Sequence, residues 1–85
     1  MSSSPNREEV VEMIREYLAE EFELEPGGIS EASRFKEDFD ADSLDLHVLG
    51  IELEDKYGIS ISEKEGGQIV TVGDAVDFVM AKAGS

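Results

Sequence analysis

Residues 42–58 have the sequence DSLDLHVLGIELEDKYG, which predicts one amphipathic helix with a clear start and stop. Asp42 and Ser43 are residue types that begin helices, and Gly58 is typical of a helix end. The helix is therefore expected over about 43–57. One of its faces carries apolar or small residues at helical spacing that should point into a core. These residues are Leu46, Leu49, Gly50, Leu53 and Tyr57.

Two further long helices are expected, one on each side of this segment. The first should begin at a cap supplied by Ser4 or Asn6, with Pro5 permitted in its first turn, and should end near Glu21. The last should follow Thr71-Val72-Gly73-Asp74, which resembles a capping box and precedes an apolar stripe of helical period.

The segments between these helices are less regular. Residues 22–41 form a long connection, and a loop of this length in a small domain is usually packed or functional. Residues 59–62 alternate isoleucine with serine, but a lone strand would have no partner, so a connecting segment is expected. A helix around 63–68 would be short, because Gly66 and Gly67 each cost about 1 kcal/mol relative to alanine.

These elements predict an all-α fold, a single domain over residues 1–85 built as a bundle of three main helices plus one short helix. Residues 1–5 and 81–85 are expected to fray. The core should come from the apolar stripes of the helices and from the connections. Its expected members are Val10, Ile14, Leu18, Phe35, Leu46, Leu49, Leu53, Ile61, Ile69, Val72, Ala75, Val76 and Val79.

Composition limits what this domain can do. Eighty-five residues leave little room for a deep, water-excluding active site, so a carrier or binding module is favoured over an enzyme. The 21 acidic and 7 basic residues give a net charge of -14. This charge repels nucleic acid and anionic membranes, attracts basic protein surfaces and favours a monomer. There is no cysteine and no apolar run long enough to span a membrane, so we expect a cytoplasmic protein.

The hydroxyl of Ser43 is the strongest candidate for a functional group. Free backbone N–H groups and the positive end of the helix dipole favour an anion at the start of a helix. Ser43 is therefore a candidate attachment point for a phosphate-linked group. Serine is also a common helix cap, and the tetrapeptide 42–45 taken alone favours that simpler interpretation.

Three blocks of sequence resemble the acyl carrier proteins of the discrete, bacterial fatty-acid-synthase type. The blocks are FKEDFDADSLD (35–45), LEDKYGI (53–59) and IVTVGDAVDFV (69–79), in the order and spacing of that family. The resemblance implies that a phosphopantetheinyl transferase attaches 4′-phosphopantetheine from coenzyme A to Ser43, and that the arm's thiol carries acyl groups as thioesters. The neighbouring residues that the transferase would recognise are Asp42, Leu44 and Asp45.

The same resemblance implies a carrier for fatty-acid biosynthesis rather than an enzyme. Its partners would be the transferase and the acyl-transfer and fatty-acid-synthesis enzymes that have basic docking patches. The family usually has an acid where Val48 stands and often a methionine where Ile51 stands, so a dedicated carrier for a polyketide or other specialised acyl pathway is an alternative. From a different class, an unmodified acidic helical interaction module, with Ser43 only as a cap, is also an alternative.

The face of the 43–57 helix opposite the core predicts a docking surface, named here the docking strip. It combines a short apolar strip with an acidic rim, which suits brief contacts with basic partners. A solvated face with a few exposed aliphatic residues has the same pattern. The docking strip comprises Leu44, Asp45, Val48, Ile51, Glu52 and Asp55.

A pocket for the acyl chain is expected between this helix and the short third helix. Gly50 replaces a larger apolar residue that is normal in the family, which costs the helix about 1 kcal/mol and leaves extra room for a chain. Asp40 replaces a glycine common three residues before the modified serine, and aspartate tolerates unusual backbone geometry better than most residues. The expected pocket residues are Phe35, Leu49, Gly50, Leu53, Ile61, Ile69 and Ala75.

Two other interpretations of this region lack required features. His47 lies four residues after Ser43, but a serine hydrolase also needs an oxyanion hole and a strained nucleophile turn. Asp38, Asp40 and Asp42 match the opening of an EF-hand loop, but the sixth position is not glycine and the twelfth is not glutamate. We therefore expect neither a hydrolase nor a specific metal site.

Overall fold

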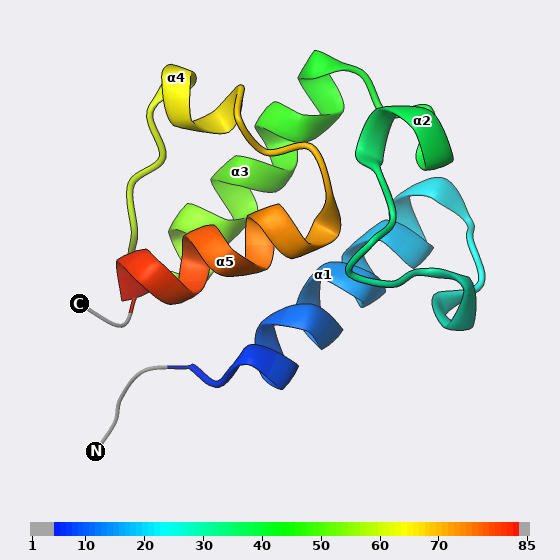
Figure 1. Ribbon diagram of the computed structural model, residues 1–85, viewed down its shortest axis with the longest axis horizontal. Helices are drawn as coiled ribbons and strands as arrows, with labels where there is room; N and C mark the ends of the chain where they lie inside the picture. Colours follow the sequence, from blue (N-terminus) through cyan, green and yellow to red (C-terminus); the bar gives the residue numbers. More distant parts are fainter. Residues whose placement is uncertain (1–4, 84–85) are drawn as a thin grey trace.

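Six helical elements make up the fold of residues 5–83, the part of the chain that the computed structural model describes (Figure 1). They are α1 (Arg7–Phe22), the 3₁₀ turn η1 (Pro26–Gly28), α2 (Phe35–Phe39), α3 (Ser43–Tyr57), α4 (Glu63–Gly66) and α5 (Val72–Ala83). Residues 5–83 contain no strand, and an isolated bridge joins Arg34 to Thr71. The predicted all-α bundle is confirmed, with η1 and α2 as additional short elements. Within the same residues, no helix is both long and apolar enough to cross a membrane.

The first helix begins at Asn6, one of its two predicted caps. The side chain of Asn6 accepts a hydrogen bond from the N–H of Glu9 at 2.8 Å. Pro5 therefore precedes the helix and does not lie in its first turn, which corrects the prediction. Ser4, the other predicted cap, lies outside the described residues.

Three helices end on a residue with left-handed backbone geometry. Gly58 ends α3 as predicted, with φ of 65°. Asp40 ends α2 with φ of 58°, which confirms that an aspartate serves where a glycine is common. Glu23 ends α1 with φ of 55°, an unusual geometry for glutamate that the sequence did not indicate. Helix α5 continues to Ala83, although fraying was expected from residue 81 onward.

Helix α5 lies between α1 and α3 and contacts both (Figure 1). The core also takes residues from the long connection, where Ile29 and Ala41 are buried without having been predicted. Leu46, Ile61 and Ile69, predicted as core, are only partly buried and pack against its edge. The buried apolar residues are Val10, Ile14, Leu18, Ile29, Phe35, Ala41, Leu49, Leu53, Val72, Ala75, Val76 and Val79.

The long connection packs against the start of α5. The N–H of Phe35 donates to the carbonyl of Val70, and the N–H of Val72 donates to the carbonyl of Ser33, both at 3.0 Å. The Phe35 side chain is fully buried. The expected packing of this loop is therefore confirmed, and only residues 40–42 separate α2 from α3.

The predicted capping box at the start of α5 is confirmed. The N–H of Asp74 donates to the Thr71 hydroxyl at 3.0 Å, and Asp74 Oδ2 accepts the N–H groups of Thr71 at 3.1 Å and Val70 at 3.0 Å. These hydrogen bonds, that from Thr71 first, hold the pKa of the Asp74 carboxyl below its ordinary value of 3.8. Because the folded-state pKa is the lower one, this stabilisation is present at neutral pH and is lost as the pH falls below about 4.

Replacing Asp74 with alanine is expected to lower the free energy of unfolding by about 1 kcal/mol, the usual cost of losing a helix cap. Asp74→Asn is the control, because its amide oxygen still accepts an N–H but carries no charge. Urea unfolding followed by circular dichroism, at about pH 7 and pH 2.5, measures both variants. The wild type should lose more stability between these two pH values than Asp74→Asn does. Equal losses would show that the charge of Asp74 does not stabilise the fold.

Candidate functional site

Ser43 is the first residue of α3, and Asp42 is the residue that caps this helix. The Oδ1 atom of Asp42 accepts the N–H of Asp45 at 2.9 Å, and the N–H of Asp42 donates to Oδ2 of Asp45 at 3.1 Å. The first of these bonds is the largest cause that lowers the pKa of Asp42 below its ordinary value. The reciprocal bonds form a capping box, which holds the two acidic residues around Ser43 in fixed positions.

The hydroxyl of Ser43 takes no part in this capping. Ser43 is exposed, and its hydroxyl makes no hydrogen bond within the described residues. The interpretation of Ser43 as the helix cap is therefore wrong, because Asp42 has that role. The Asp42 carboxylate accepts the N–H of Asp45, which is one of the backbone N–H groups at the start of α3. The Ser43 hydroxyl itself is accessible at the start of the helix.

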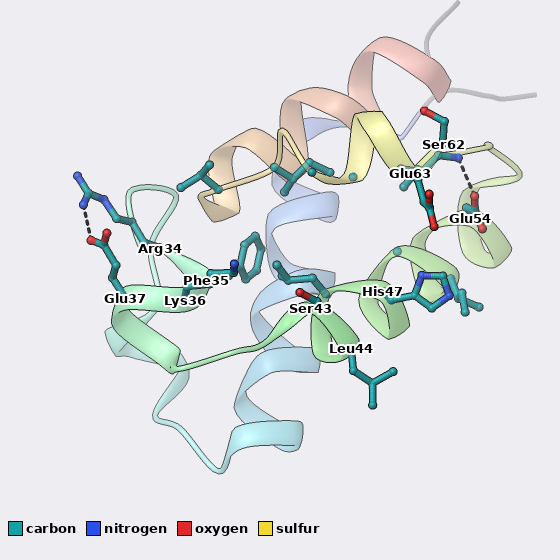
Figure 2. Close-up of a pocket in the computed structure, with 18 residues that line it drawn as sticks. Arg34, Phe35, Lys36, Glu37, Ser43, Leu44, His47, Glu54, Ser62 and Glu63 are labelled. Atoms are coloured by element: carbon teal, nitrogen blue, oxygen red, sulfur yellow. Dashed lines mark hydrogen bonds and ion pairs between the residues drawn. The ribbon is translucent and has the colours of Figure 1, made fainter.

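Ser43 lines a partly open groove of about 730 Å³ (Figure 2). Helix α3 forms one wall, the segment from Ile61 to Val70 with α4 forms the other, and residues 34–37 of the α2 region complete the lining. Apolar atoms provide most of the surface, and five charged residues also line it: Arg34, Lys36, Glu37, Glu54 and Glu63. The volume is within the range of small-molecule sites, about 300–1,000 Å³.

The predicted pocket residues divide between this groove and the core. Those that line the groove are Phe35, Gly50, Ile61 and Ile69. Leu49, Leu53 and Ala75 do not line it, because they face the bundle interior, where each is 3% exposed or less. Leu46 and His47 line the groove but were not assigned to it. The signal for them was their position one helical turn after the serine, on the same side of α3.

A hydrogen bond joins the segment before α4 to α3. The N–H of Ile61 donates to Oε2 of Glu54 at 2.6 Å, and Figure 2 marks this bond with a dashed line. Helix α4 begins with a capping box between Ser62 and Glu65, a start signal that the prediction had not used. The short third helix is therefore formed, as a single turn.

Gly50 leaves an open space in the α3 wall of the groove. A Cβ added to Gly50 would meet no other heavy atom within 4 Å, apart from the adjacent backbone of its own helix. Its backbone has ordinary helical geometry, since Gly58 is the glycine with positive φ among residues 5–83. Neither close packing nor backbone geometry therefore requires glycine at position 50.

Gly50→Ala is expected to raise the free energy of unfolding by about 1 kcal/mol, the difference in helix propensity between glycine and alanine. Urea unfolding measures the change. Gly58→Ala is the matched control and should destabilise the protein, because alanine rarely adopts the left-handed geometry of Gly58. A Gly50→Ala variant no more stable than the wild type would mean that the protein needs the empty space for its own packing.

The docking strip is exposed to solvent. Leu44, Val48 and Ile51 are 68%, 41% and 49% exposed, which is high for aliphatic side chains. In Figure 2 the Leu44 side chain points away from α4. Glu52 and Asp55 are exposed beside these residues, while the third acidic residue of the strip belongs to the capping box.

Known sequences match this chain over most of its length. Residues 12–79 match the family described as "Phosphopantetheine attachment site". The acyl carrier protein of Lactobacillus acidophilus is 38% identical over 79 residues, which cover 93% of this chain and 99% of the relative. The acyl carrier protein of Rubrobacter xylanophilus is 39% identical over 75 residues, which cover 88% of this chain and 93% of the relative.

Solved structures agree with this comparison. The acyl carrier protein from Enterococcus faecalis superposes with a TM-score of 0.81 at 32% identity, covering 92% of this chain and 99% of that one. The crystal structure of acyl carrier protein from Thermotoga maritima superposes with a TM-score of 0.77 at 28% identity, covering 89% of this chain and 88% of that one. An exposed serine hydroxyl beside an apolar groove fits a covalently attached 4′-phosphopantetheine. The chain therefore belongs to the acyl carrier proteins, which are phosphopantetheine-bearing carriers and not enzymes.

Proposed function

We propose that Ser43 bears the 4′-phosphopantetheine and that the protein carries acyl intermediates of fatty-acid biosynthesis on the thiol of this arm. The observation that supports this most is the position of the Ser43 hydroxyl, which is exposed, has no hydrogen-bond partner among residues 5–83 and lies on the lining of an apolar groove. The chain has no cysteine, so the thiol of the thioester has to come from the arm.

Attachment requires a serine oxygen that the transferase can reach. This oxygen forms a bond to the phosphorus of the phosphopantetheine group as the pyrophosphate bond of coenzyme A breaks. The nucleotide half leaves as adenosine 3′,5′-bisphosphate, and the hydroxyl proton passes to a base of the transferase. We assign recognition to Asp42, Asp45 and Leu44, the first two fixed by the capping box and the third highly exposed. The attached phosphate lies at the start of α3, where the helix dipole favours negative charge, and Ser43 lines the groove, so the arm can reach the groove from its point of attachment.

The docking strip is the surface that partner enzymes would contact. Its exposed aliphatic residues offer a small apolar contact, and its acidic rim, with the net charge of -14, steers basic surfaces toward it. Such contacts are brief, which suits a carrier that visits several enzymes in turn. The same charge repels a second copy of the chain, so the proposed carrier is monomeric, and we place it in the cytoplasm with its partners.

The pathway is tested by malonyl transfer and elongation. The phosphopantetheine-loaded protein is incubated with malonyl transferase and purified fatty-acid-synthesis enzymes, and its acyl state is followed by mass. We expect malonylation and then elongation. Malonylation without elongation would favour a polyketide or other specialised carrier, the alternative supported by Val48 where the family usually has an acid. Val48→Glu should then restore elongation if the missing acid is the cause.

A further inference from the structure

We propose that the groove is shaped for acyl groups wider than a straight chain, those with an apolar branch or ring, and that Gly50 is the residue that selects them. This inference rests on the proposed function, because it assumes that the groove receives the acyl group carried from Ser43. It adds the class of acyl group and the residue that determines it.

Glycines reduce the bulk of both walls of the groove. Gly50 lies on the α3 wall, and Gly66 and Gly67 lie on the α4 wall. None of the three has a positive φ. A Cβ at Gly66 would lie 3.9 Å from the Ile61 side chain, and one at Gly67 would lie 3.5 Å from the Lys64 carbonyl oxygen, both ordinary contacts. A Cβ would therefore fit at all three positions, so packing does not require glycine there, and we assign the glycines the role of leaving space in the groove.

The space at Gly50 widens the groove and does not lengthen it. Residues on both sides of Gly50 along α3 line the groove, with Ser43 and His47 before it and Ile51 and Glu54 after it. At a rise of about 1.5 Å per residue, Gly50 lies roughly 10 Å along the helix from Ser43, in the middle of the wall. A longer straight chain gains little from a side space at this point, whereas a substituent on the chain can occupy it.

The surroundings of this space favour an apolar substituent. Ile51 follows Gly50 on α3, and Ile61 lies on the opposite wall. The carboxylate of Glu54, one helical turn after Gly50 on the same wall, already accepts the N–H of Ile61 at 2.6 Å. A methyl branch or a ring would therefore be buried against aliphatic side chains without leaving that carboxylate unpaired.

Thioester protection tests the proposal. Loaded wild type, Gly50→Ala and Gly50→Leu are each charged with a straight or a branched acyl group of equal carbon number. The rate at which hydroxylamine cleaves the thioester is then measured. The wild type should protect both isomers relative to the same thioesters of free pantetheine. In Gly50→Leu, the cleavage rate of the branched thioester should rise about tenfold and that of the straight thioester less than about twofold, both relative to the wild type. The rates of Gly50→Ala should lie between those of the wild type and Gly50→Leu.

Gly28→Leu is the control, because Gly28 also faces open space but does not line the groove. Circular dichroism shows that each variant is folded. Equal changes for the two isomers in Gly50→Leu, or no change for either, would overturn the proposal. So would a wild type that loads normally but protects neither isomer. Failure of loading, seen directly by intact mass, would overturn the proposed function as well.

Discussion

Ser43→Ala is expected to abolish acyl loading completely while the fold stays intact. Alanine lacks the oxygen to which the arm is attached, and no partial activity can replace a missing covalent bond. The fold should not respond, because Asp42 caps α3 and the Ser43 hydroxyl bonds to nothing within residues 5–83. We expect a change in the free energy of unfolding below about 0.5 kcal/mol, as for an ordinary surface substitution. Intact mass after incubation with coenzyme A and a transferase measures loading, and urea unfolding measures stability.

Two control variants separate attachment from capping. Ser60→Ala removes another exposed serine hydroxyl and should load like the wild type. Asp42→Ala keeps the Ser43 hydroxyl but loses the capping box, so it should be less stable than Ser43→Ala. A Ser43→Ala protein that still gains phosphopantetheine would contradict the assignment of the site.

Phe35→Ala is expected to lower the free energy of unfolding by about 3–5 kcal/mol, the usual cost of deleting a buried aromatic ring. Phe35 is 1% exposed, contacts the Phe39 ring edge-on at 6.4 Å between centroids, and supports the hydrogen-bonded junction with Val70. Small domains are stabilised by only about 0.05–0.15 kcal/mol per residue. This single change should therefore leave much of the population unfolded, as thermal and urea unfolding would reveal.

Phe35→Leu is the conservative control, because it keeps most of the buried apolar volume and should cost less than about 1.5 kcal/mol. Val70→Ala is the control for the groove, since Val70 also lines it but is 53% exposed. It should change stability much less than Phe35→Ala. A loss below about 1 kcal/mol in Phe35→Ala would contradict the packing of α2 against the core.

The long helices could be predicted because their signals are local. Asp42 and Gly58 bracket α3, and the Thr71–Asp74 pair starts α5, so the chain near each end determines the boundary. The left-handed Asp40 was also predictable, because aspartate tolerates that geometry. Each of these features depends on residues a few positions apart.

Other features depend on contacts between distant residues. Ile29 and Ala41 are buried in the core, and α2 begins at Phe35, whose N–H donates to the carbonyl of Val70, 35 positions away. No periodic pattern within the connection marks them. Contacts between distant residues also explain why Leu49, Leu53 and Ala75 were wrongly predicted to line the pocket. The core stripe and the groove stripe lie side by side on α3. Packing of the bundle buries Leu49, and the segment with α4 forms the opposite wall of the groove that its neighbour Gly50 lines.

The identity of the helix cap was open between two neighbouring residues. Serine and aspartate both cap helices, and either Asp42 or Ser43 suited the sequence. The reciprocal bonds between Asp42 and Asp45 settle the choice and leave the serine hydroxyl accessible. The predicted start of the helix at Ser43 is confirmed, and capping by Asp42 supports the carrier proposal, because a hydroxyl used for capping would be less available for attachment.

The most direct test of this proposal is the intact mass of the wild type before and after incubation with coenzyme A and a broad-specificity phosphopantetheinyl transferase, followed by fragmentation of the peptide that contains residues 42–45. The proposal predicts a gain of one phosphopantetheine, located on Ser43. No gain in a folded protein that was not already modified, or a gain located on another serine, would contradict it.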